Sequence, residues 1–139
     1  MKTLLPVRIV FGLACAYEVA LGLAFIFAGP SIFRSLGIEP PNHWGYLHFS
    51  AALLLVFGLM FFQVARDPVG RAHLIPYGVL LKACYVATVA WHWYDAGVPT
   101  MWKVFALADV VFALAFLWSL APIRAATTPP PPGAMPHTA

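Results

Sequence analysis

Residues 74–94 read LIPYGVLLKACYVATVAWHWY, an apolar stretch with one charged residue, Lys82, near its middle. A helix of this length crosses the ~30 Å hydrocarbon core of a bilayer. A charge at that depth is costly unless it has a partner, which makes Lys82 a candidate functional residue. The stretch therefore predicts both a transmembrane helix and a polar site inside the membrane.

The composition of the chain is typical of a membrane protein. Apolar residues make up 62% of its 139 residues and charged residues 9%, with a mean hydropathy of +0.83. A soluble domain carries about 25% charged residues. The net charge of +3 comes from scattered basic residues, so we expect no nucleic-acid partner. The length allows one domain.

Three further apolar stretches resemble residues 74–94 in length. Together they predict transmembrane helices at about residues 5–27, 44–64, 74–94 and 101–120. Strands are excluded because these runs lack the alternating pattern of a membrane barrel. Gly29-Pro30 is expected to end the first helix. Short connections make consecutive helices antiparallel, so we expect an all-α, integral membrane, up-down four-helix bundle over residues 1–124.

The two ends of the chain differ in composition: the first is apolar and the second is rich in proline. Residues 5–27 are too long for the apolar part of a signal peptide and lack a clear cleavage site, so we expect this helix to be retained. Residues 125–139 contain the four prolines of 129–132 and offer little to bury. They predict a disordered, proline-rich tail.

The basic residues predict the orientation. With four spans, both termini and the connection after residue 64 lie on one side of the membrane. The other side carries two basic residues, Arg34 and Lys103. The side with the termini carries five: Lys2, Arg8, Arg66, Arg71 and Arg124. Because positive charge favours the cytoplasmic side, we expect an inner-membrane protein with both termini in the cytoplasm.

Two acids lie at the same depth as Lys82. Glu18 and Asp109 fall near the middle of residues 5–27 and 101–120. Lys82 cannot reach an interface roughly 15 Å away, so it needs a partner inside the membrane. We therefore expect a buried charged cluster of Glu18, Lys82 and Asp109. Two acids and one base leave one excess negative charge, so one carboxyl is expected to hold a proton.

Three polar residues could support this cluster. Tyr85 lies on the face of Lys82 and could donate a hydrogen bond to a carboxylate, whereas His48 and His92 lie nearer the outer surface. The two histidines could mark a path towards Lys82. A buried ion pair can instead fix helix register without chemistry, so a structural and a functional role stay open.

The sequence gives weaker indications of haem binding and of cysteine redox chemistry. His48 and His92 could hold a haem iron between helices, but no paired-histidine repeat or haem-attachment motif accompanies them. Cys15 and Cys84 could form a redox pair, although buried cysteines usually act as small apolar residues. The sequence has no nucleophile, nucleotide-binding or zinc motif, so we predict no catalytic residue and no metal site. Whether the protein uses a cofactor stays unknown.

Four short segments carry a resemblance to a known group: Gly37-Ile38-Glu39-Pro40-Pro41, Ala65-Arg66-Asp67-Pro68, Tyr77-Gly78-Val79-Leu80-Leu81-Lys82, and Trp102-Lys103 with Asp109. Over about residues 4–121 the chain resembles the DoxX-like small four-helix bacterial membrane proteins. Some DoxX relatives are subunits of quinone-linked oxidoreductases, so the resemblance implies association with a redox system. It implies no catalytic residue.

Two functional hypotheses follow. The first is an accessory or assembly subunit, linked to a quinone or another redox system through a membrane protein partner. The alternative is a carrier or proton-coupled binding protein for a small molecule, with Glu18, Lys82 and Asp109 as its site. We favour a protein that is not an enzyme.

Overall fold

The computed structural model describes residues 4–128 and contains four long helices. They are α1 (Leu5–Ser35), α2 (Trp44–Arg66), α3 (Ile75–Asp95) and α4 (Thr100–Thr127), with a short 3₁₀ turn, η1 (Ala72–Leu74), before α3. No strand occurs within the described range. All four helices are long and apolar enough to cross a membrane.

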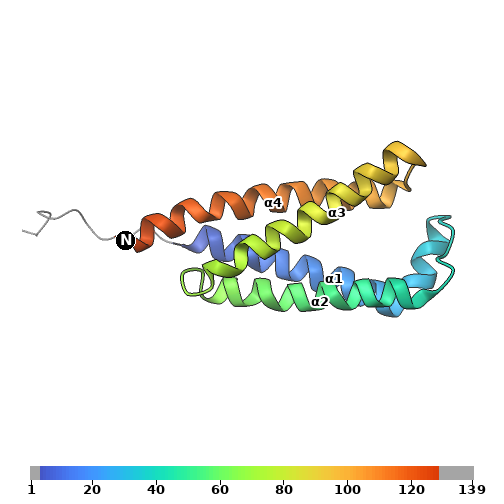
Figure 1. The fold of residues 1–139 in the computed structure, drawn as a ribbon. Helices are drawn as coiled ribbons and strands as arrows, with labels where there is room; N and C mark the ends of the chain where they lie inside the picture. Colours follow the sequence, from blue (N-terminus) through green and yellow to red (C-terminus); the bar gives the residue numbers. More distant parts are fainter. Residues whose placement is uncertain (1–3, 129–139) are drawn as a thin grey trace, which may run out of the picture.

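The helices run in alternating directions (Figure 1). The start of α1, the connection 67–74 and the end of α4 lie together at what we call the Arg66 end. The connections 36–43 and 96–99 lie at the opposite end, which we call the Trp44 end. An up-down order of consecutive helices results.

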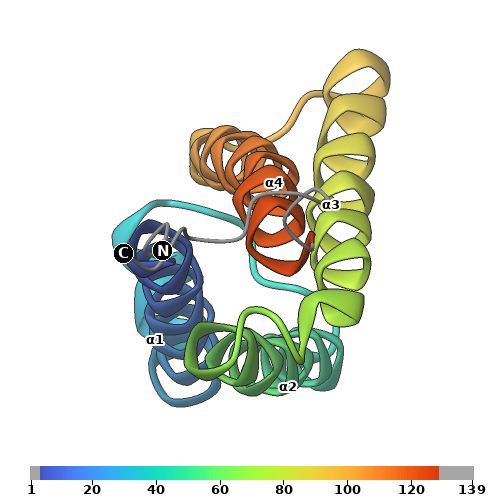
Figure 2. The ribbon, with the colours of Figure 1, turned by 90° about the vertical axis from the view of Figure 1, so that its left-hand side faces the viewer.

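The helices form two pairs. α1 packs along α2, and α3 packs along α4, whereas contact between the pairs is much less extensive. The two pairs meet near the Arg66 end and diverge towards the Trp44 end (Figures 1 and 2). α2 and α3 therefore separate as they leave the connection that joins them.

Two apolar cores hold the pairs together. Near the Arg66 end, the Phe11 ring stacks on Phe116 with centroids 4.6 Å apart, and Phe61 lies 5.0 Å from Phe116. Near the Trp44 end, Phe25 and Phe33 pack with Trp102. Glu18 of α1 and Asp109 of α4 lie between these two cores, and both are buried.

The prediction that Gly29-Pro30 ends the first helix is wrong, because α1 continues to Ser35. Proline removes only one donor, and a long helix tolerates this where neighbours pack around it. The extra turn places Phe33 5.4 Å from the Trp44 ring. Beyond Ser35 the chain turns away at Gly37, whose φ of 63° suits glycine, and the Ile38 N–H donates to the Phe33 carbonyl at 2.9 Å.

The predicted start of the tail at residue 125 is also wrong. Residues 125–127 belong to α4, because alanine favours helix and the Thr127 hydroxyl donates to the Arg124 carbonyl at 3.0 Å. Thr128 turns to an extended conformation before Pro129, as residues preceding proline do. The rest of the tail, 129–139, lies outside the described residues.

Candidate functional site

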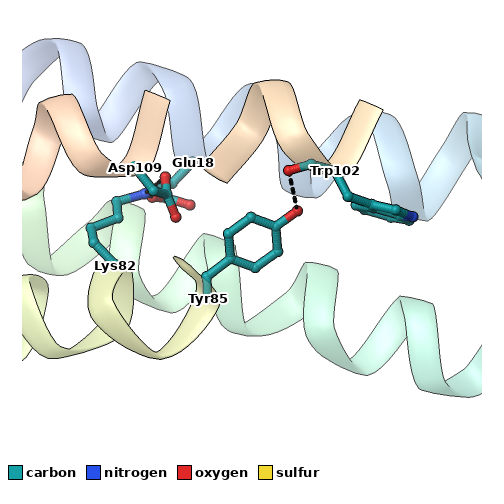
Figure 3. A network of polar contacts seen from close by, with 5 residues as sticks. All are labelled: Glu18, Lys82, Tyr85, Trp102 and Asp109. Atoms are coloured by element: carbon teal, nitrogen blue, oxygen red, sulfur yellow. Dashed lines mark hydrogen bonds and ion pairs between the residues drawn. The ribbon is translucent and has the colours of Figure 1, made fainter. Parts of the chain in front are cut away.

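Three helices bring Glu18, Lys82 and Asp109 together. Glu18 comes from α1, Lys82 from α3 and Asp109 from α4, and their exposed fractions are 0%, 1% and 6%. The Lys82 ammonium donates to Asp109 Oδ1 at 2.7 Å and to Glu18 Oε1 (Figure 3). The lysine thus forms a bridge between two carboxylates on two other helices.

Two aromatic rings complete the surroundings of the ammonium. Lys82 Nζ lies 5.0 Å from the centre of the Tyr17 ring and 5.5 Å from that of Phe112. An ammonium over an aromatic face is stabilised by the ring quadrupole, and more so away from water. Neither residue was predicted to be part of the site. Tyr17 precedes Glu18, and Phe112 lies one turn after Asp109, so helical spacing could have indicated the second.

The cluster has unused hydrogen-bonding capacity. Glu18 Oε2 and the Tyr17 hydroxyl are buried and have no hydrogen-bond partner within residues 4–128. A buried polar atom without a partner costs free energy, so native structures rarely leave one without a reason. Two carboxylates also face one ammonium. The site can therefore accept a further hydrogen-bond donor or positive charge.

Tyr85 does not donate to a carboxylate as the sequence suggested. Its hydroxyl points away from the cluster and donates to the Trp102 backbone carbonyl at 3.4 Å (Figure 3). Since Trp102 lies in the first turn of α4, this bond links the middle of α3 to the Trp44 end of α4. Tyr85 is therefore part of the wall beside the cluster.

A cavity of about 140 Å³ lies beside the charged cluster. Glu18, Lys82 and Asp109 form part of its lining, together with Tyr17 and Tyr85. The rest is largely apolar and comes from all four helices, with Leu21, Phe25, Leu47, Leu54, Leu81 and Phe105 among its residues. An apolar cavity with a few convergent polar groups is the usual form of a small-molecule site.

A second hollow, of about 420 Å³, lies next to this cavity towards the Trp44 end. The two share Leu47, Ser50 and Trp102 in their linings. The outer hollow also contains Glu39 and Tyr46. The divergence of the two helix pairs thus leaves space from the connections down to the charged cluster.

The structure does not bring His48 and His92 to the cluster. Both are exposed, and neither lines the cavity. The His48 ring lies 6.5 Å from that of Trp44. Of the two cysteines, both free, Cys15 packs against the core of the Arg66 end and Cys84 is exposed. Residues 4–128 contain no group of three metal-ligating side chains.

Comparison of the chain with protein-family models, with curated proteins and with solved structures gives no match. The resemblance to DoxX-like proteins therefore stays a prediction.

Proposed function

We propose that this chain is an integral protein of a bacterial inner membrane that binds a small, largely apolar molecule. The molecule occupies the cavity and directs a polar group at Glu18, Lys82 and Asp109. The observation that carries the proposal is the apolar cavity of about 140 Å³ with the charged cluster in its wall. Ligand sites in helix bundles are built in this way, from side chains on facing helices.

A membrane setting is supported by the outward faces of the helices. Large apolar side chains point away from the bundle on every helix, among them Leu13, Phe27, Val56, Leu80, Leu107 and Leu114. A water-soluble protein rarely exposes so much contiguous apolar surface. Lipid covers such surface without cost, and with the apolar length of the helices this favours a membrane bundle over a soluble one.

Ligand binding is favoured over a purely structural role by the space around the cluster. An ion pair that only fixes helix register is best served by close packing and fully paired atoms. Here an open cavity adjoins the charges, and Glu18 Oε2 has no partner among the described residues. The accessory-subunit hypothesis drawn from the sequence therefore takes second place.

Filling the cavity tests the proposal. Leu54→Trp is expected to abolish binding of neopentylbenzene, a neutral aromatic probe, because the larger side chain projects into the cavity. Leu53→Trp is the matched control, since Leu53 is 41% exposed and faces outward from the same helix. Binding is measured by native mass spectrometry and by the shift in thermal unfolding of the purified full-length protein in nanodiscs. Equal, saturable binding by both variants would contradict a site in this cavity.

The orientation is tested by labelling single cysteines in cells. In a chain with Cys15 and Cys84 replaced by serine, we expect Ala96→Cys to react with a membrane-impermeant maleimide added outside. Val69→Cys should react only after permeabilisation, because the connection 67–74 shares its side with Arg66 and Arg71. The reverse pattern would place the termini outside the cytoplasm.

A further inference from the structure

We infer that the ligand is a monovalent organic cation with an apolar or aromatic body, and that it binds in exchange for a proton. This inference rests on the proposed function, because it names the chemical class that the same cavity takes. Charge balance, the aromatic lining and the acid at the outer hollow each support it.

The charge balance favours a positive ligand. Glu18 and Asp109 can carry two negative charges, and Lys82 supplies one positive charge. A net charge buried away from water is costly, so the cluster needs one more positive charge or one proton. The buried Glu18 Oε2 has no partner within residues 4–128, and Asp109, at 6%, is the most exposed of the three.

The lining suits an organic cation. Besides Tyr17 beside the cluster, aromatic side chains come from α1, α3 and α4: Phe25, Tyr85, Trp102 and Phe105. Aromatic faces stabilise ammonium groups that have lost their water, and tryptophan does so best. An ammonium with an apolar body would therefore find aromatic faces along the cavity and a carboxylate at its end.

The outer hollow carries negative charge, as the two carboxylates of the cluster do. Glu39 belongs to its lining, which contains no basic side chain among the described residues. A hollow lined by one sign of charge raises the local concentration of the opposite ion. The outer hollow at the Trp44 end thus favours a cation over an anion.

Proton exchange follows from the groups that face the cluster. The titratable side chains come from α1 (Tyr17 and Glu18), α3 (Lys82 and Tyr85) and α4 (Asp109), whereas the α2 residues of the described lining contain none. With the cavity empty, one proton on a carboxyl makes the cluster neutral. When a monovalent cation takes its place, that proton leaves and total charge is unchanged.

A pair of probes with the same shape tests this inference. Benzyltrimethylammonium and neopentylbenzene differ in one atom, nitrogen against carbon, and in one positive charge. We expect the cation to bind the full-length protein in nanodiscs at least about tenfold more tightly, as one desolvated cation–π contact with a facing carboxylate implies. Calorimetry in two buffers of different ionisation enthalpy should show proton release, and affinity should fall by up to about tenfold per pH unit in acid.

Single variants separate the effect of the Asp109 charge on binding from the effect of the cavity volume. Asp109→Asn is expected to reduce binding of the cation at least about tenfold and to leave binding of neopentylbenzene unchanged. Asp95→Asn, which removes an exposed carboxylate outside the cavity lining, should change neither. If Asp109→Asn does not fold, proton release by the native protein on binding the cation tests the inference instead.

The outcomes for the two proposals differ. Equal affinity for both probes, or cation binding without proton release, would overturn the cation inference and leave the cavity as a binding site. Failure of both probes to bind would overturn the proposed function itself.

Discussion

Replacing Lys82 by methionine is expected to cost about 3–5 kcal/mol of folding free energy, because two buried carboxylates lose the ammonium between them. Methionine keeps most of the volume of the side chain, so the loss reports the charge and not a cavity. The measurement is unfolding in mixed micelles, with the amount of protein in the membrane fraction as a second readout. Lys103→Met is the control: Lys103 lies 4.3 Å from the Trp93 ring near the Trp44 end and should contribute about 1 kcal/mol or less.

Neutralising the whole cluster should restore the fold. Glu18→Gln, Lys82→Met and Asp109→Asn together leave no buried charge, and such replacements are often neutral for stability. The triple variant should unfold near the native protein but lose preference for a cationic probe. Native stability of Lys82→Met alone would show that the three groups do not share an ion pair. If the triple variant is as unstable as Lys82→Met, the lost folding free energy comes from packing and not from unpaired charge.

Gly22→Ala is expected to destabilise the protein by about 1–3 kcal/mol, because α1 and α2 are too close there for a side chain. A Cβ at residue 22 would lie 2.8 Å from the Ala51 carbonyl oxygen and 2.8 Å from Leu55 Cδ2. A backbone oxygen cannot move aside without shifting its helix. The two helices must therefore separate along their interface, and thermal unfolding should report the loss.

Gly12→Ala provides the comparison on the same helix. A Cβ at residue 12 meets nothing within 4 Å, so the change should be neutral or stabilise by up to about 1 kcal/mol through helix propensity. Similar effects at both positions would indicate that propensity, and not the closeness of α1 and α2, decides. The pair thus separates an interface effect from an effect of helix formation.

Hydropathy and depth predicted the helices and the meeting of the three charges. The four helices follow from apolar length, and a charge at mid-depth has few alternatives to a partner at the same depth. The predicted helix end at Gly29-Pro30 was wrong because packing overrides the local effect of proline there. Phe33 gains contacts with Trp44 and Trp102 when α1 passes Pro30, and these contacts outweigh the one hydrogen bond that proline removes.

The cavity could not be predicted because it depends on how the helix pairs diverge. No single residue encodes that divergence: phenylalanine rings pack together at the Arg66 end, and the larger rings of Trp44 and Trp102 lie at the other. The hydrogen bond of Tyr85 depends on it as well, since the position of Trp102 places a backbone carbonyl within its reach. Helical spacing describes one helix at a time and does not give the distance between helices.

The divergence of the two pairs gives the molecule a wedge shape, narrower at the Arg66 end than at the Trp44 end (Figure 1). In a bilayer, such a protein occupies unequal areas in the two leaflets. Lipids would relieve that mismatch most easily where the membrane bends to widen the leaflet around Trp44. Local curvature and lateral pressure would then act on the separation of α2 and α3. Lipid composition would therefore influence how readily the proposed ligand enters the cavity.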